Sequence, residues 1–310
     1  MIHQKDLRII YLGTPDFAVP GLQLLVKEGY NVVAVITAPD KPAGRGLTLQ
    51  HSDVKKAALE LNIPVLQPEK LKDPAFLEEL ASYKANLQIV VAFRMLPESV
   101  WNMPEIGTFN LHGSLLPQYR GAAPINWAII NGEKETGLTT FFLKHEIDTG
   151  DMMLQVKETI QEEDTFEVLY NRLKEIGATL ILNTVQLIEK GGYETIPQDT
   201  SVPLKAAPKL FKETCQIDWN KTEEEVYNFV RGLSPYPCAW TVLNGKTYKV
   251  IAVKKTQSVV DNAQHAIGSV LEEDNKAYVY CQSGKIELIE IQAEGKKRMK
   301  VLDYLRGNKI

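Results

Sequence analysis

Two polar side chains lie two residues apart near the end of an apolar run, Asn110 and His112 in the segment 108–112. In a strand, this spacing points both side chains to the same face of the sheet. Ligands of open α/β sheets bind at the carboxyl ends of the strands, so the amide and the imidazole could converge on one substrate atom. Together they would stabilise a developing oxyanion, and the imidazole can also move a proton. Polar residues also mark strand ends without any function, so the spacing alone leaves both interpretations open.

A carboxylate follows the next expected strand. Asp148 begins the sequence Asp-Thr-Gly-Asp shortly after the segment 137–143, and Asp near Gly is commonly turn chemistry. Alternatively, Asp148 lies beside His112, where a carboxylate would favour the imidazolium and hold the ring in place. A metal site built from His112, His145, Asp148 and Asp151 is a third interpretation, but the chain has no HExxH motif and nothing supplies a further ligand. We therefore expect no metal.

Several common nucleotide-binding and nucleophile patterns are missing from the sequence. The expected first strand, 7–13, ends without the second and third glycines of a dinucleotide site, and no GxxxxGK[ST] phosphate loop occurs. We expect neither a nicotinamide dinucleotide nor ATP, and we interpret Gly13 as a turn residue. Ser114 is not part of a GxSxG motif, so no nucleophilic triad is indicated.

The elements that must position these residues alternate between strands and helices, which predicts an N-terminal doubly wound, mostly parallel, Rossmann-like sheet. The expected strands are 7–13, 31–37, 87–93, 108–112 and 137–143, and the expected helices are 16–28 and 52–61. Ser52 is the expected N-cap of the second helix. The strongest helical periodicity runs over 164–190, where Asp164 and Glu167 resemble a capping box.

The second half of the chain has a different pattern of predicted elements, with a linker followed by short strands. Residues 193–209 contain three prolines and little periodicity, which is typical of a linker. A helix is expected from Thr222, and two hairpins follow, the first around Asn244-Gly245 and the second joining 277–281 to 286–291. These short strands favour a small OB-like β-barrel, although a sandwich fits the same periodicity. We predict an N-terminal domain over 1–192, a linker over 193–208 and a C-terminal domain over 209–310.

Composition and charge limit the classes of protein. The 310 residues, 44% hydrophobic and 24% charged, are typical of a globular chain with two domains. The net charge is −4, but residues 208–310 hold 16 Lys and Arg against 13 Asp and Glu, so a polyanion would prefer the second domain. Three cysteines without CxxC spacing indicate neither a disulfide framework nor a zinc site. With no long apolar stretch and no signal peptide, we expect a cytoplasmic protein that does not contact the membrane.

Longer motifs surround the polar residues described above. They are Asn110-Leu111-His112, Ser114-Leu115-Leu116-Pro117, Tyr119-Arg120-Gly121-Ala122-Ala123-Pro124 and Ile147-Asp148-Thr149-Gly150-Asp151. With these motifs the chain resembles the 10-formyltetrahydrofolate-dependent formyltransferase family. The likeness continues through 41–46, 217–219, 231–233 and 295–299, so it covers nearly the whole chain.

The resemblance implies the fold described above and a role for each motif. It implies a catalytic trio of Asn110, His112 and Asp148 that acts without a metal, with 10-formyltetrahydrofolate as co-substrate. The folate-binding residues would be Ser114, Leu115, Leu116, Pro117, Phe93, Arg94, Met95 and Leu96. The acceptor would be the amine of the initiator methionyl-tRNA, contacted by Arg45, Lys296, Lys297 and Arg298. We expect a monomer.

Two other functions remain compatible with the sequence. The same chemistry could serve another acceptor, either an amino-sugar nucleotide or water, which would make the protein a different transferase or a hydrolase. Alternatively, the chain could be an RNA-binding module that retains an inactive fold, because fold alone does not determine function.

Overall fold

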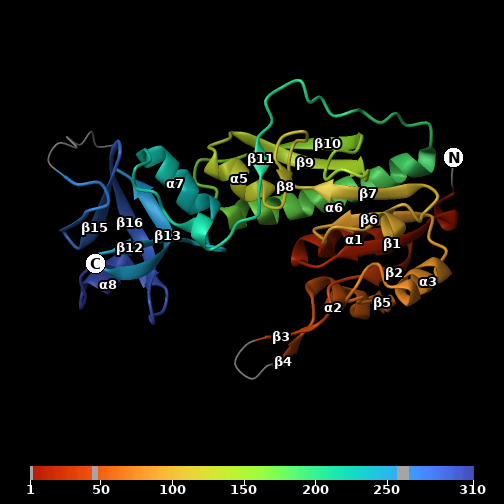
Figure 1. Ribbon diagram of the computed structural model, residues 1–310, viewed down its shortest axis with the longest axis horizontal. Coiled ribbons are helices and arrows are strands. Elements are labelled where there is room, and N and C mark those ends of the chain that lie inside the picture. The colour runs from red at the N-terminus through yellow and green to blue at the C-terminus, as the bar shows by residue number, and fades with distance from the viewer. Residues whose placement is uncertain (1–2, 44–47, 257–264) are drawn as a thin grey trace. The chain divides into compact units, whose positions relative to one another are not determined.

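The computed structural model describes residues 3–43, 48–256 and 265–310, and its contacts divide the chain into two compact units (Figure 1). The first unit comprises Met1–Arg120, Gly137–Glu158 and Asn171–Lys205, and the second comprises Gly121–Thr136, Thr159–Tyr170 and Ala206–Ile310. Each unit is therefore built from three separate stretches of chain. No helix in the described ranges has the length and apolar character required to cross a membrane.

A seven-stranded sheet runs through the first unit, with the strand order β10-β9-β7-β6-β1-β2-β5. Neighbouring strands from β7 to β5 pair in parallel, and β9 pairs antiparallel to β7. The strands are β1 (Arg8–Gly13), β2 (Asn31–Ile36), β5 (Val65–Leu66), β6 (Leu87–Val91), β7 (Gly107–His112), β9 (Glu135–Phe142) and β10 (Met152–Thr159). The prediction of a mostly parallel, Rossmann-like sheet is confirmed.

Alternate residues of the strands pack against helices on opposite faces of this sheet. On one face, the Tyr11 hydroxyl donates to the carbonyl of Ala18, and Gly21 of α1 (Val19–Lys27) lies against Ile181 of α6 (Phe166–Lys190). On the other face, Ile10 belongs to a buried cluster with α3 (Pro74–Ser82) and α4 (Glu98–Trp101). The helix α2 (Asp53–Glu60) begins at Ser52, whose hydroxyl accepts from Lys55 N at 3.0 Å, so the predicted N-cap is confirmed.

Two local predictions are wrong, one in the first unit and one at the start of α6 in the second unit. Gly13 is not a turn residue, because it pairs with Val91 inside the sheet and a Cβ there would lie 2.6 Å from the Cβ of Ala18. Close packing, not a turn, therefore requires this glycine. The capping residue of α6 is Thr165 rather than Asp164, since the Thr165 hydroxyl accepts from Val168 N while the buried Asp164 carboxylate accepts from Gln161 N.

An antiparallel sheet forms most of the second unit, with the strand order β12-β13-β16-β15-β14 and β17 paired to β16. The strands are β12 (Ala239–Leu243), β13 (Lys246–Lys255), β14 (Val270–Glu273), β15 (Lys276–Cys281), β16 (Gly284–Ala293) and β17 (Met299–Lys300). The helices of this unit are α5 (Pro124–Ile130), α7 (Glu223–Gly232) and α8 (Val301–Leu305). The prediction of a second, small β domain is confirmed.

Local signals in this unit also agree with the structure. Thr222 and Glu225 form a reciprocal capping box at the start of α7. Asn244 and Gly245 both have positive φ, 46° and 77°, as a type I′ turn between β12 and β13 requires. The two edges of the strand path are joined through Ile310, whose N–H donates to Glu272 on β14 and whose carbonyl accepts from Asn244.

The segment expected as a linker makes specific contacts within the first unit. Ile196 and Met152 form an antiparallel bridge with two hydrogen bonds of 2.8 Å, and Tyr119 N donates to the carbonyl of Lys205.

The remaining short elements are η1 (Gln4–Asp6), η2 (Asp16–Ala18), η3 (Glu213–Cys215), β3 (Lys41–Ala43), β4 (Thr48–Gln50), β8 (Arg120–Gly121) and β11 (Ala206–Ala207).

A buried guanidinium holds α7 against the segment 159–170 of the same unit. Arg231 is 6% exposed, and it donates to the side chain of Asn228 and to the carbonyls of Asp164 and Gln161. Burial lowers the pKa of this guanidinium. Removing it would leave these buried oxygens without their donors, which is costly in a low-dielectric interior.

We expect Arg231→Met to destabilise the protein by about 2–4 kcal/mol, because methionine fills the space but donates no hydrogen bond. Thermal unfolding measures this change. The control is Arg306→Met, since Arg306 is exposed and pairs with the exposed Asp303 three residues earlier. Equal Tm values for the two variants would contradict the role assigned to Arg231.

Candidate active site

Strand β7 carries Asn110 and His112 to the edge of the sheet where the parallel strands end. Between them, Leu111 lies against the position of Gly177 on α6. Because successive side chains of a strand alternate, Asn110 and His112 point to the opposite face of the sheet from α6. Among the described residues the Asn110 amide has no hydrogen-bond partner, so it can donate to an incoming group.

The His112 ring is held in one orientation by a backbone carbonyl. His112 is 6% exposed, and its Nε2 lies 2.8 Å from the carbonyl oxygen of Tyr119. A carbonyl can only accept a hydrogen bond, which assigns the hydrogen to Nε2 and leaves Nδ1 of the neutral ring with a free lone pair. Nδ1 is therefore the atom of this side chain that can take up a proton.

Asp148 faces that nitrogen. The chain turns after β9, Asp148 adopts a positive φ of 55°, and its Oδ2 lies 3.8 Å from Nδ1 of His112. The turn is braced at several points, because Lys144 pairs with Asp151 at 2.8 Å and the Thr149 hydroxyl donates to the carbonyl of Glu146. The structure thus brings together the imidazole and the carboxylate that the sequence places 36 positions apart.

His145 does not join this group. Its side chain is 75% exposed, its ring packs edge-on against Trp101 with centroids 5.4 Å apart, and its Nε2 lies 3.6 Å from Glu98. Within the described ranges, no group of three or more His, Cys, Asp or Glu residues is arranged to hold a metal ion. The four-residue metal site considered from the sequence therefore has no counterpart in this geometry.

The segment after His112 is fixed by its own polar groups. Ser114 is fully buried and its hydroxyl donates to the carbonyl of Gln118 at 2.6 Å. Thr139 of β9 donates to the carbonyl of Ser114 and accepts from Leu116 N, so the backbone here is tied to the neighbouring strand. The Ser114 hydroxyl serves the turn, whereas Leu115 and Pro117 of the same segment are partly buried.

The segment Phe93–Leu96 follows β6 and lies at the same edge as His112, because β6 and β7 are adjacent and parallel. Phe93 and Leu96 pack against the core, whereas Met95 is 73% exposed. The guanidinium of Arg94 lies over the Phe93 ring and donates to the carbonyls of Pro68 and Glu69. Arg94 is thus already engaged with the protein backbone.

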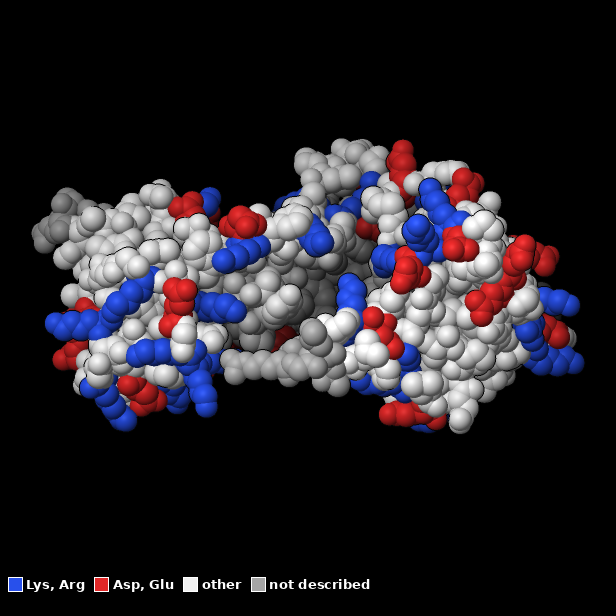
Figure 2. Space-filling view, turned by 60° about the horizontal axis from the view of Figure 1, so that its bottom comes forward, with Lys and Arg blue, Asp and Glu red and all other residues white. Residues whose placement is uncertain are grey.

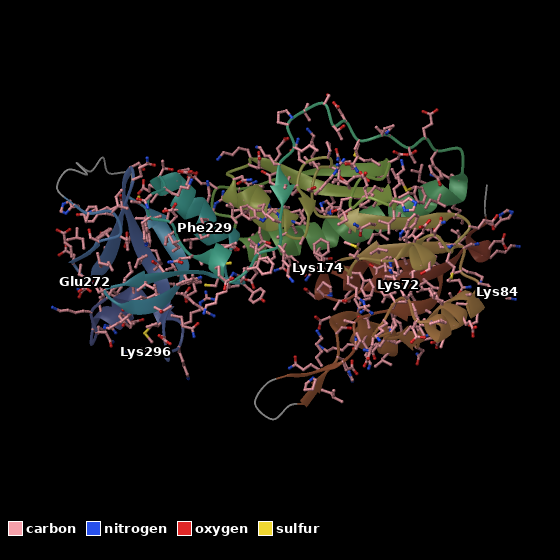
Figure 3. The ribbon with its side chains drawn as sticks, viewed as in Figure 1. Lys72, Lys84, Lys174, Phe229, Glu272 and Lys296 are labelled. Carbon is pink, nitrogen blue, oxygen red and sulfur yellow. The ribbon has the colours of Figure 1, made fainter. Side chains whose placement is uncertain are left out.

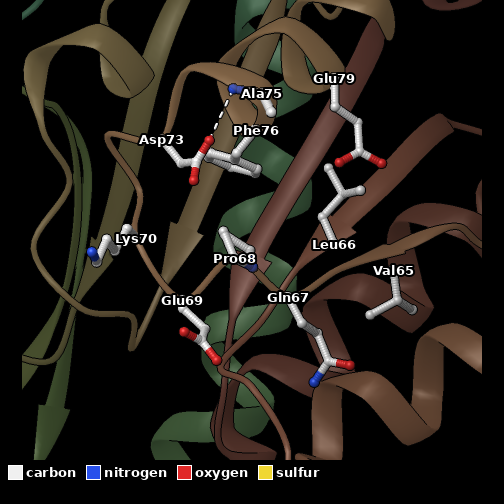
Figure 4. Close-up of a pocket in the computed structure, with 10 residues that line it drawn as sticks. All are labelled: Val65, Leu66, Gln67, Pro68, Glu69, Lys70, Asp73, Ala75, Phe76 and Glu79. Atoms are coloured by element: carbon white, nitrogen blue, oxygen red, sulfur yellow. Dashed lines mark hydrogen bonds between the residues drawn. The ribbon is translucent and has the colours of Figure 1, made fainter.

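Two of the cavities in the first unit can be compared with the position of the trio. One, of about 550 Å³, lies beside β5 and α3 (Figure 4), and is lined by Val65, Leu66, Gln67, Pro68, Glu69, Lys70, Asp73, Ala75, Phe76 and Glu79. No member of the trio lines it, and Asp73 there caps α3 by accepting from Ala75 N. The other, of about 450 Å³, is lined by Trp101, Leu143, Lys144, His145, Glu146 and Thr149. This second cavity adjoins the turn that carries Asp148.

Three of the residues expected to contact RNA, Lys296, Lys297 and Arg298, are consecutive in the second unit. Lys and Arg side chains are scattered over this unit, on the left of Figure 2, among acidic ones. Arg298 is held by Glu290 through two hydrogen bonds of 2.7 Å, and Lys296, which Figure 3 labels, donates to Asn308. Lys297 is exposed. Arg45 lies outside the described residues.

The residues on either side of the segment 41–50 are held together by one carboxylate. Asp40 accepts from Lys55 Nζ at 2.5 Å and from Gln67 Nε2 at 2.9 Å, and His51 lies 3.0 Å from the same carboxylate. Hydrogen bonds from Lys55 and Gln67 hold the pKa of the Asp40 carboxyl well below its ordinary value. These contacts anchor both ends of the hairpin formed by β3 and β4.

The site combines a carboxylate, an imidazole and an amide, those of Asp148, His112 and Asn110, at one edge of a doubly wound sheet. These groups suit acyl transfer to an amine. The comparisons with known proteins agree with this chemistry. The chain belongs to the formyl transferase family: residues 7–185 match the formyl transferase domain and residues 209–309 match the formyl transferase C-terminal domain. The family inferred from the motifs is thus confirmed.

Individual formyl transferases and solved structures that are similar to this chain can also be named. The methionyl-tRNA formyltransferase of Bacteroides fragilis is 54% identical over 310 residues, which span 98% of this chain and 96% of the relative. Among solved structures, HypX from Aquifex aeolicus in complex with tetrahydrofolic acid matches with a TM-score of 0.65 at 18% identity, over 96% of this chain and 47% of that chain. An N-formyltransferase from Helicobacter canadensis, in complex with folinic acid and dTDP-3-aminofucose, matches with a TM-score of 0.67 at 21% identity, over 93% and 99%.

Proposed function

We propose that this protein transfers the formyl group of 10-formyltetrahydrofolate to the free α-amine of methionine on the initiator tRNA. One observation carries the proposal: the 54% identity to the Bacteroides fragilis methionyl-tRNA formyltransferase extends over 98% of this chain. It includes the C-terminal unit, which an acceptor-binding role requires. A folate co-substrate agrees with the solved fold neighbours, one of which holds tetrahydrofolic acid.

In this proposal, His112 manages the proton of the attacking amine. The neutral amine attacks the formyl carbon, a C–N bond forms, and the carbonyl electrons move onto oxygen. Nδ1 of His112 takes the proton that the nitrogen loses, and the carboxylate of Asp148 at 3.8 Å stabilises the resulting imidazolium. The bond to N10 of the folate then breaks and N10 takes up that proton, leaving a formamide and tetrahydrofolate.

Asn110 would stabilise the oxygen in this step. The Asn110 amide lies on the same face of β7 as His112 and can donate to the oxyanion of the tetrahedral intermediate. A donor fixed on a strand needs no reorganisation when the charge develops, which is the basis of its contribution to rate. No covalent enzyme intermediate and no metal takes part in this scheme.

The other predicted roles complete the proposal. The segments 93–96 and 114–117 would border the pterin and the rest of the folate, and the second unit would hold the tRNA. Among its predicted contacts, Lys297 is exposed, whereas Arg298 would have to leave Glu290 to reach a phosphate. We propose that the protein works as a monomer in the cytoplasm, where charged initiator tRNA is used.

The decisive experiment follows the label of a formyl donor. The purified protein is mixed with labelled 10-formyltetrahydrofolate and with methionyl-tRNA, an amino-sugar nucleotide or buffer alone. We expect label on the methionyl-tRNA and none elsewhere. Label on the sugar, or release of formate without acceptor, would replace the proposed acceptor. Binding of tRNA without any transfer would favour an RNA-binding module.

Arg45 gives a separate prediction. We expect Arg45→Ala to raise the KM for methionyl-tRNA about tenfold, because a guanidinium that contacts phosphate and stacks on bases is lost. The KM for 10-formyltetrahydrofolate should stay the same, since the substitution is far in sequence from the folate segments. Steady-state kinetics with each substrate varied in turn measures both constants. An unchanged KM for tRNA would remove Arg45 from the tRNA contacts.

A further inference from the structure

The segment between α6 and β11 lies alongside the turn that carries Asp148. The bridge between Met152 and Ile196 is antiparallel, so pairing continued by two residues places Gln198 opposite Gly150. At Gly150 the chain already belongs to the turn, and the side chain of Gln198, not its backbone, makes the hydrogen bonds. The Gln198 Nε2 atom donates to the carbonyl of Asp148 and to the carbonyl of Gly150, both at 2.8 Å.

The other end of the same amide binds Arg120. The Oε1 atom of Gln198 accepts from Nε of Arg120 at 3.0 Å and from Nη2 at 2.6 Å. A glutamine amide has two N–H donors and one oxygen with two lone pairs. Gln198 therefore uses its whole hydrogen-bonding capacity. Its nitrogen binds the turn of Asp148, and its oxygen binds Arg120 of strand β8.

The turn at Asp148 and strand β8, where Arg120 lies, are each linked to one member of the catalytic pair. Asp148 lies in one of them, and its backbone carbonyl is the first of the two that Gln198 binds. Arg120 directly follows Tyr119, whose carbonyl fixes Nε2 of His112. Gln198 is thus connected to the carboxylate through the turn of Asp148, and to the imidazole through Arg120 and the neighbouring Tyr119.

We propose that Gln198 is a positioning residue that sets the separation of the Asp148 carboxylate from Nδ1 of His112. This inference rests on the proposed function, because it concerns the same reaction. Gln198 contacts neither reacting group through its own side chain, so it acts through Asp148. A displacement of about 1 Å in a reacting group costs about a hundredfold in rate, which makes such bracing significant.

The test is Gln198→Glu, measured by formyl transfer to methionyl-tRNA. Glutamate keeps the size of the side chain and its acceptor for Arg120, but it presents oxygen instead of N–H to two carbonyl oxygens. We expect kcat to fall about 30- to 100-fold while the KM values for folate and tRNA change less than about twofold. Gln198→Met, which lacks every polar atom of the amide, should give a similar loss and serves as a second variant if the first folds poorly.

A double-mutant cycle separates positioning from general stability. If Gln198 acts through Asp148, combining Gln198→Glu with Asp148→Asn should lower kcat no further than Asp148→Asn does alone. A residue that only stabilises the fold would give losses that multiply, together with a lower Tm. Full multiplication of the two losses, or wild-type kcat in both Gln198 variants, would overturn the inference.

The matched control is Gln118→Glu. Gln118 also tethers this segment, donating to the carbonyl of Pro203 and accepting from Lys205 N, but within the described ranges no hydrogen bond joins its side chain to the turn of Asp148. We expect its kcat to stay within about twofold of the wild type. An equal loss in this control would attribute the effect to the segment as a whole and overturn the role of Gln198. If the wild type itself formylates no tRNA, the proposed function fails, which is a distinct result.

Discussion

Replacing Asp148 with asparagine should lower kcat for formyl transfer by about 10³-fold, with the fold and folate binding largely retained. Asparagine has the same shape, so the turn is preserved. It lacks the negative charge that faces Nδ1 of His112 at 3.8 Å, and the protonated ring formed during attack loses its counter-charge. His112→Ala should cause a loss of similar size, because it removes the proton acceptor itself.

Single-turnover formyl transfer, with folate binding measured in parallel, tests this prediction. The control is Asp151→Asn, the same chemical change three positions later, where the carboxylate pairs with the half-exposed Lys144. We expect this control to stay within a few-fold of the wild type. Near-normal turnover in both Asp148→Asn and His112→Ala would contradict the mechanism, because in this mechanism His112 accepts the proton and Asp148 stabilises the protonated ring.

The largest structural effect should come from Gly150→Ala. A Cβ at this buried position would lie 1.6 Å from the carbonyl oxygen of Phe142 and 2.8 Å from its carbonyl carbon. Both are backbone atoms at the end of β9, so a small side-chain rearrangement cannot relieve the overlap. Either the strand end or the Asp148 turn must move, and each movement displaces the carboxylate from His112.

We expect Gly150→Ala to destabilise the protein by about 3 kcal/mol or more and to lower kcat by at least about a hundredfold in the fraction that folds. Thermal unfolding and active-site titration report the two effects separately. Gly307→Ala is the control, since a Cβ there meets nothing within 4 Å. A Gly150→Ala variant with the Tm and kcat of the wild type would mean that the turn has another conformation in solution.

The sequence predicts the framework of the site because that framework depends on local patterns. Apolar runs and an N-cap at Ser52 locate the sheet and its helices, and alternation along β7 places Asn110 and His112 on one face. The capping box of α7 and the Asn244-Gly245 turn are likewise encoded within a few residues. Each of these features needs no knowledge of distant contacts.

The remaining features depend on long-range contacts between backbone groups. The carbonyl that orients His112 belongs to Tyr119, and any residue type could supply it. Gln198 lies in a proline-containing stretch that sequence patterns favour as a linker, and the bridge between Met152 and Ile196 helps to bring it to the site. The cap of α6 is a local exception: it falls on Thr165 because the Asp164 carboxylate accepts from Gln161 N, three residues earlier, which helical periodicity does not reveal.

A crystal structure of the protein with the stable analogue 5-formyltetrahydrofolate tests the central claim most directly. We predict the formyl carbon between Asn110 and His112, with the formyl oxygen about 3 Å from the Asn110 amide nitrogen and Nδ1 of His112 facing the side open to an amine. A folate bound with its formyl group away from these two side chains, for example in the cavity beside β5 and α3, would contradict the account.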